Sequence, residues 1–160
     1  MTVPEAVVAI DISASPERVW EVITDIAVMP RFSSELQGVE WADGFTAAGI
    51  GAQFLGHNRH PAVGEWTTRS EIVEFEPGRF FGWAVGDPAN PAATWRYELS
   101  PIPGGSRLSY TGRIGPGRSG VTMLIERDPD HADEIIANRL REFRSGMTAT
   151  LEGIRELAQG

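Results

Sequence analysis

Apart from its acidic residues, which fall mostly on outward-facing positions, two tyrosines and three histidines are the side chains of this sequence that could take part in proton transfer. Tyr97 and Tyr110 lie in segments of alternating apolar and polar residues, and a phenol there could polarise the carbonyl of a ligand or bond a backbone carbonyl instead. His57 could act as a general base if a β-bulge turned its side chain inward, and otherwise it is an ordinary polar residue. These three residues are the candidate catalytic groups.

The sequence predicts no metal site and no cofactor. His57 and His60 are three residues apart on or just after an expected strand, so they do not share a face, and His131 lies far away near a helix start. The chain has no cysteine, which excludes thiolate nucleophiles and disulfides. All 14 basic residues are arginine, so Schiff-base and lysine general-base chemistry are also excluded.

Large aromatic residues follow an inward-facing alternation along several expected strands. They form either a solid core or the wall of a mostly apolar cavity with a few polar groups. The candidate ligand-binding residues are Phe54, Asn58, Trp66, Thr68, Ser70, Phe81, Trp83, Trp95, Tyr97, Tyr110, Phe143 and Met147.

Length and composition restrict the partners. A chain of 160 residues with 41% hydrophobic residues is expected to form a single domain over residues 1–160. Its net charge of −8 disfavours nucleic acid as a partner. No apolar run approaches the roughly 20 residues of a membrane helix, so we expect no membrane insertion and a cytoplasmic location.

The elements that position these residues can be located by periodicity and turn residues. Ser15 is expected to cap a helix that begins at Pro16, and a short helical turn is expected at 32–36. Residues 120–126 form a separate helical piece, and residues 130–158 form a long helix with one apolar stripe, in which Gly146 marks a bend or a close backbone approach. Antiparallel strands are expected at 6–12, 38–42, 52–59, 65–75, 79–85, 94–100 and 107–113.

Several motifs in this order resemble one superfamily. They are the opening segment from Ser15 to Asp25, Met29-Pro30-Arg31-Phe32, Phe54-Leu55-Gly56, Glu76-Pro77-Gly78, Thr94-Trp95-Arg96-Tyr97 and Gly104-Gly105-Ser106-Arg107-Leu108. Together they resemble the START-like, SRPBCC or polyketide cyclase/dehydrase superfamily. The resemblance implies an α+β helix-grip fold, in which a curved antiparallel sheet of about seven strands wraps around a long C-terminal helix and two short helices follow the first strand.

Three functions follow as alternatives. The first is binding of a hydrophobic or aromatic small molecule, lipid-like or polyketide-like, in a cavity between the sheet and the C-terminal helix. The second is a polyketide cyclase, aromatase or dehydratase. The third is a protein-interaction module linked to stress or chaperones, and a homodimer remains open in each case.

Overall fold

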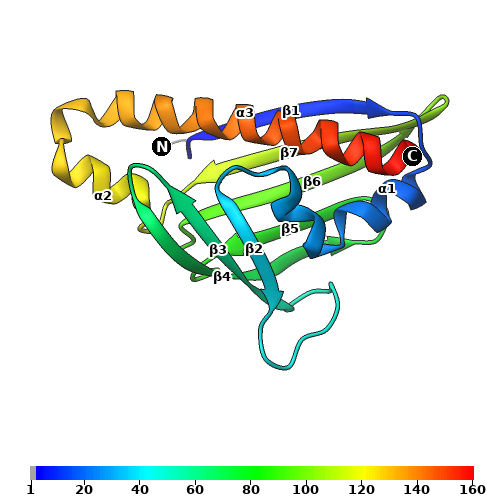
Figure 1. The fold of residues 1–160 in the computed structure, drawn as a ribbon, viewed down its shortest axis with the longest axis horizontal. Coiled ribbons are helices and arrows are strands. Elements are labelled where there is room, and N and C mark those ends of the chain that lie inside the picture. Colours follow the sequence, from blue (N-terminus) through cyan, green and yellow to red (C-terminus); the bar gives the residue numbers. More distant parts are fainter. Residues whose placement is uncertain (1–2) are drawn as a thin grey trace.

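A curved antiparallel sheet and a long C-terminal helix dominate the computed structural model, which describes residues 3–160 (Figure 1). This arrangement confirms the expected helix-grip α+β fold. The elements are β1 (Glu5–Ile12), α1 (Pro16–Ile23), the 3-10 helix η1 (Ile26–Phe32), β2 (Leu36–Trp41), β3 (Gln53–His60), β4 (Gly64–Glu76), β5 (Phe80–Val85), β6 (Ala93–Ile102), β7 (Gly105–Ile114), α2 (Gly120–Arg127), the 3-10 helix η2 (Pro129–His131) and α3 (Ala132–Gln159).

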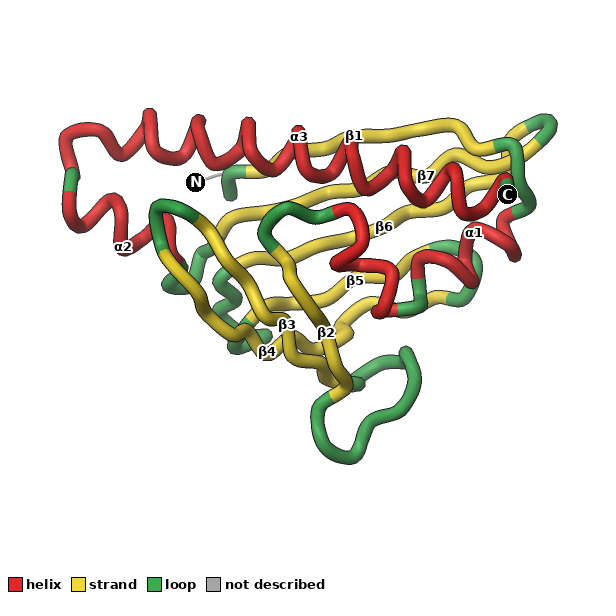
Figure 2. The backbone as a smooth tube through the Cα atoms, in the orientation of Figure 1, coloured by secondary structure: helices red, strands yellow, loops and turns green. Residues whose placement is uncertain are grey.

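All seven strands belong to one sheet in the order β1-β7-β6-β5-β4-β3-β2. The first strand therefore pairs with the last, with Val8 opposite Tyr110, while β2 forms the other edge. Figure 2 shows β2, β3 and β4 steeply inclined to β1, β6 and β7, so the twisted sheet has one concave face. The helices α1 and α3 pack on this concave side, and α3 lies along β1.

The two short helices after β1 begin at side-chain caps. The Ser15 hydroxyl accepts a hydrogen bond from the Arg18 amide at 3.2 Å, and Pro16 occupies the first turn of α1, as predicted. Asp25 caps η1 in the same way by accepting from the Ala27 amide at 3.0 Å. The expected helical turn at 32–36 is wrong, because η1 ends at Phe32 and β2 already begins at Leu36.

The long helix α3 buries the predicted apolar stripe against the sheet. Phe143, Met147, Leu151 and Ile154 are each at most 8% exposed. The close approach expected at Gly146 is wrong, because a Cβ there would meet nothing within 4 Å. The close approach is at Gly153, where the ring of Phe32 lies directly against the helix backbone and leaves no room for a side chain.

The predicted strands all occur, and each end lies within two residues of its expected position. The separate helix at 120–126 is also present, as α2. None of the helices formed by residues 3–160 is long and apolar enough to cross a bilayer.

Candidate functional site

Aromatic rings form a continuous path across the concave face. Neighbouring ring centroids along it are between 4.1 and 6.2 Å apart, and Phe81 joins the path from the side. The structure thus brings together most of the predicted ligand-binding residues. The path runs through Trp41, Phe54, Trp83, Tyr97, Tyr110, Trp95 and Phe143.

Where the path reaches α3, its own rings fill the space between sheet and helix. The ring centroids of Trp95 and Phe143 are 4.6 Å apart. Beneath them, a Cβ on Gly112 would lie 2.5 Å from the Trp95 ring and 3.2 Å from the Phe143 ring. A ligand cannot lie between these two rings in this conformation. Met147, one turn further along α3, is only 3% exposed.

The concave side of β3 and β4 is more exposed to solvent than the region where Phe143 of α3 contacts Trp95. Asn58, Trp66 and Thr68 share its face with the buried Phe54 and Ser70, yet all three remain partly exposed. The Asn58 side-chain amide donates to the Gly56 carbonyl at 3.2 Å and to the Thr68 hydroxyl at 3.4 Å. This surface combines one indole with an amide and a hydroxyl, which is typical of small-molecule sites.

Tyr97 and Tyr110 stack in the middle of the aromatic path. Their ring centroids are 4.1 Å apart at an interplanar angle of 15°, and they are 3% and 8% exposed. Burial raises the pKa of the Tyr97 phenol well above its ordinary value, and the neighbouring Tyr110 phenol raises it further. Burial also raises the pKa of Tyr110, although the hydrogen bond with Tyr97 partly opposes this. Both phenols therefore keep their protons at neutral pH and can donate hydrogen bonds but not accept a proton as bases.

His57 lies away from the aromatic path. It is exposed on the convex side of β3, and its ring nitrogens lie 3.2 Å from the Thr67 hydroxyl and 3.0 Å from the Glu40 carboxylate. The irregularity in this strand pair falls in β2, between Leu36 and Gly38, and does not turn His57 inward. The structure therefore places His57 where it cannot reach a ligand on the concave face.

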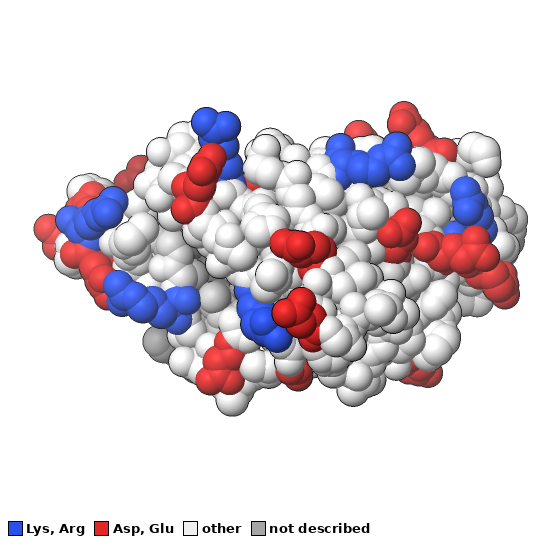
Figure 3. All heavy atoms as spheres, turned by 60° about the horizontal axis from the view of Figure 1, so that its bottom comes forward, with Lys and Arg blue, Asp and Glu red and all other residues white. Residues whose placement is uncertain are grey.

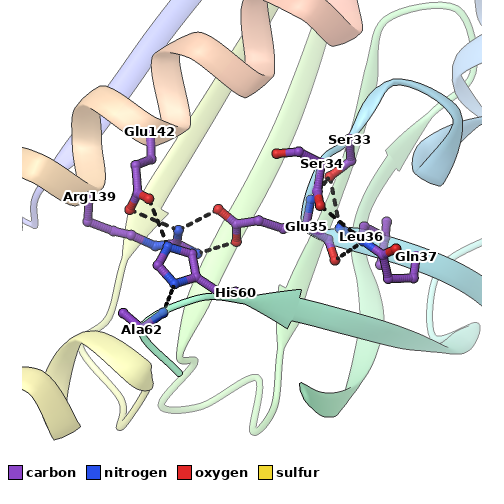
Figure 4. A network of polar contacts seen from close by, with 9 residues as sticks. All are labelled: Ser33, Ser34, Glu35, Leu36, Gln37, His60, Ala62, Arg139 and Glu142. Atoms are coloured by element: carbon purple, nitrogen blue, oxygen red, sulfur yellow. Dashed lines mark hydrogen bonds and ion pairs between the residues drawn. The ribbon is translucent and has the colours of Figure 1, made fainter. Parts of the chain in front are cut away.

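A polar cluster that we did not predict joins α3 to the opposite edge of the sheet. Figure 4 shows Arg139 and Glu142 of α3 pointing toward Glu35, just before β2, and His60, at the end of β3. Arg139 donates two hydrogen bonds to Glu35, at 2.6 and 2.8 Å, and one to Glu142 at 3.3 Å. His60 Nε2 lies 2.7 Å from Glu142. We call these four residues the Arg139 cluster.

Burial and pairing act in opposite directions on the charged groups of the Arg139 cluster. Burial raises the pKa of the Glu142 carboxyl, but the hydrogen bond from His60 and the Arg139 charge outweigh it and lower the pKa below its ordinary value. For the Arg139 guanidinium the directions are reversed. Burial lowers its pKa, but the hydrogen bonds and charges of Glu35 and Glu142 outweigh burial and raise the pKa above its ordinary value. Both groups are therefore charged at neutral pH.

The Arg139 cluster is better suited to ion pairing than to a metal. One ligand atom from each of Glu35, His60 and Glu142 lies within 4.8 Å of the others. However, the Arg139 guanidinium already donates hydrogen bonds to both carboxylates. The Ala62 amide donates to His60 Nδ1 at 2.9 Å, which places the imidazole proton on Nε2, the nitrogen that faces Glu142. A metal on Nε2 would require a protonated Nδ1, which would oppose this amide.

We predict that Arg139→Ala lowers the free energy of unfolding by about 2 kcal/mol, because it leaves the half-buried Glu35 carboxylate without its partner. The Arg139 and Glu35 side chains are 19% and 27% exposed. The matched control is Arg59→Ala on the β3–β4 hairpin, where Arg59 and Glu65 are 70% and 78% exposed. Arg59→Ala should lower the free energy of unfolding, measured by urea titration, by less than about 0.5 kcal/mol. Equal costs for the two variants would contradict the prediction.

Comparison with known proteins agrees with this architecture. Residues 4–152 match the model of the family described as polyketide cyclase / dehydrase and lipid transport. No curated protein matches the chain. Among solved structures, the polyketide-cyclase-like protein Cgl2372 from Corynebacterium glutamicum is 27% identical, with a TM-score of 0.70 over 99% of this chain and 93% of that one.

Two aromatase/cyclases share the fold at lower identity. The Zhui aromatase/cyclase from Streptomyces sp. R1128 is 14% identical, with a TM-score of 0.68, and the match covers 99% of this chain and 94% of that one. The di-domain aromatase/cyclase StfQ of the steffimycin biosynthetic pathway is 12% identical, with a TM-score of 0.75 over 98% of this chain and 51% of that one.

Proposed function

Because the chain belongs to the polyketide cyclase / dehydrase and lipid transport family, we propose that it binds a hydrophobic or aromatic small molecule on the concave face between the sheet and α3. One observation carries the proposal. The inward-facing Asn58, Trp66, Thr68 and Trp95 remain partly exposed although they share a face with the buried core. Such surface is available to a ligand that stacks on the indoles and bonds the amide or the hydroxyl.

Direct binding tests this proposal. Aromatic polyketides, sterols and fatty acids are titrated into the protein and followed by calorimetry, and native mass spectrometry of the fresh protein reports any co-purified molecule. We expect one ligand per chain, and we expect Trp66→Ala to weaken binding at least about tenfold because it removes the stacking surface. His57→Ala on the convex side is the control and should leave affinity unchanged. If no panel compound binds and nothing co-purifies, the binding function is refuted.

A second candidate function is a cyclase, aromatase or dehydratase acting on a polyketide-like substrate. The stacked Tyr97 and Tyr110 favour it, because two protonated phenols could donate hydrogen bonds to a substrate carbonyl or to an enolate oxygen that develops from it. Because the pKa of each phenol is raised, both can only donate hydrogen bonds. A proton acceptor would have to come from the substrate or from water. Turnover of such a substrate distinguishes this function from binding alone.

A further inference from the structure

A hollow of about 440 Å³ lies at the edge of the concave face, away from the Arg139 cluster. Its walls come from α1, from η1 and the residues just before it, from β2 and β4, and from the loop between β2 and β3. That loop, residues 42–52, projects beyond the sheet at the bottom of Figure 1. We call this site the α1–β2 hollow. The hollow is an open depression, so a ligand there would keep one side toward solvent.

The apolar walls of the α1–β2 hollow are the outer members of the aromatic set. Trp41 contacts Phe54, with ring centroids 6.2 Å apart, and Phe75 contacts Phe81 at 6.1 Å. Both Trp41 and Phe75 remain partly exposed. The hollow therefore adjoins the aromatic rings of the concave face, and a flat apolar molecule there would contact aromatic surface.

The polar part of the α1–β2 hollow is acidic. Glu21 on α1 and Asp25, the cap of η1, both line it, whereas no arginine or histidine among residues 3–160 does. Arg18 lies 3.5 Å from Glu21, but this pair is exposed, at 47% and 70%, and contributes little. Figure 3 shows charged side chains scattered between wide uncharged areas on the face that is turned up from the bottom of Figure 1. With a net charge of −8 on the chain, the field at the hollow favours a cation.

We propose that the α1–β2 hollow binds an aromatic amine, with the rings against Trp41 and Phe75 and the ammonium group beside Glu21 and Asp25. This inference goes beyond the proposed function, because the residues that line the hollow do not include Asn58, Trp66, Thr68 or Trp95, and it assigns a second site with its own class of ligand.

Three matched probes test the inference: 2-naphthylethylamine, the corresponding alcohol and the corresponding carboxylic acid. In calorimetry at about 50 mM NaCl we expect the amine to bind about fivefold more tightly than the alcohol, and the acid most weakly. At about 0.5 M NaCl the difference between amine and alcohol should nearly vanish, because the two carboxylates are near the surface.

Two sets of variants locate the binding. Glu21→Gln with Asp25→Asn should remove the amine preference and keep alcohol binding, since asparagine caps a helix as well as aspartate. The control removes two acidic groups from the far end of α3, by Asp133→Asn with Glu134→Gln, and should keep the preference. Ala48→Phe, or Ala47→Phe if the first variant lowers the melting temperature, fills the hollow and should weaken all three probes at least about tenfold.

The outcomes separate this inference from the proposed function. If apolar panel compounds bind but the amine has no advantage over the alcohol, the inference is refuted and the binding function stands. The same holds if the preference survives removal of both carboxylates, or if filling the hollow leaves the affinities unchanged. If neither the probes nor the panel compounds bind, both are refuted.

Discussion

Neither tyrosine of the native protein should ionise at about pH 11, although a free tyrosine is mostly ionised there. The chain has only two tyrosines, so the near-ultraviolet absorbance of tyrosinate reports on this pair alone. Burial raises the pKa of Tyr97 well above its ordinary value, and burial also raises the pKa of Tyr110. We expect the absorbance step near pH 10 only in the protein unfolded by urea.

The same property predicts that stability falls steeply in alkali. A phenol whose pKa is raised by folding stabilises the protein fully below its unfolded pKa, near 10, and loses this contribution as the pH rises toward its folded pKa. Above about pH 10 each tyrosine should lower the free energy of unfolding by about 1.4 kcal/mol per pH unit. Urea unfolding at several pH values measures the slope.

Tyr97→Phe is the matched control, because it removes one phenol and keeps the stacked ring. It should reduce the alkaline slope by about half, and Tyr97→Phe with Tyr110→Phe should remove the tyrosine contribution altogether. A tyrosinate step near pH 10 in the native protein would show that water reaches the pair. In that case the two phenols would not be the desolvated donors that the catalytic alternative requires.

The strands and the long helix could be predicted from the sequence because their signals are local. Alternation over a few residues located β6, with Tyr97 and Leu99 buried as expected, and the three-to-four spacing located α3. Turn residues such as Glu76-Pro77-Gly78 fixed most strand ends. The resemblance to the superfamily then supplied the arrangement of these elements in space, which periodicity alone does not contain.

The polar parts of the site could not be predicted in the same way. His60 and Glu142 are 82 residues apart, and Arg139 and Glu35 are 104 apart, so no local pattern links them. The α1–β2 hollow depends on the path of the loop between β2 and β3, which periodicity does not determine. Pairing of the inward residues could be anticipated, but whether their rings touch α3 depends on packing details such as the absence of a side chain at Gly112.

Two glycine-to-alanine changes should act in opposite directions, and the first has the larger effect. Gly105 starts β7 beside the end of β1, and a Cβ built there would overlap the carbonyl oxygen of Ile12. Because the obstacle is backbone, no side-chain rotation can relieve it, and β7 must shift relative to β1. We expect Gly105→Ala to lower the free energy of unfolding by about 3 kcal/mol in urea titrations.

Gly146→Ala is the matched change in α3. A Cβ there would meet nothing within 4 Å, and alanine is favoured over glycine inside a helix. We therefore expect Gly146→Ala to raise the free energy of unfolding by about 1 kcal/mol. The contrast tests the pairing that holds β1 at the edge of the sheet, since β7 is its neighbour in the strand order. A tolerated Gly105→Ala would mean that β1 can move away from β7 at little cost.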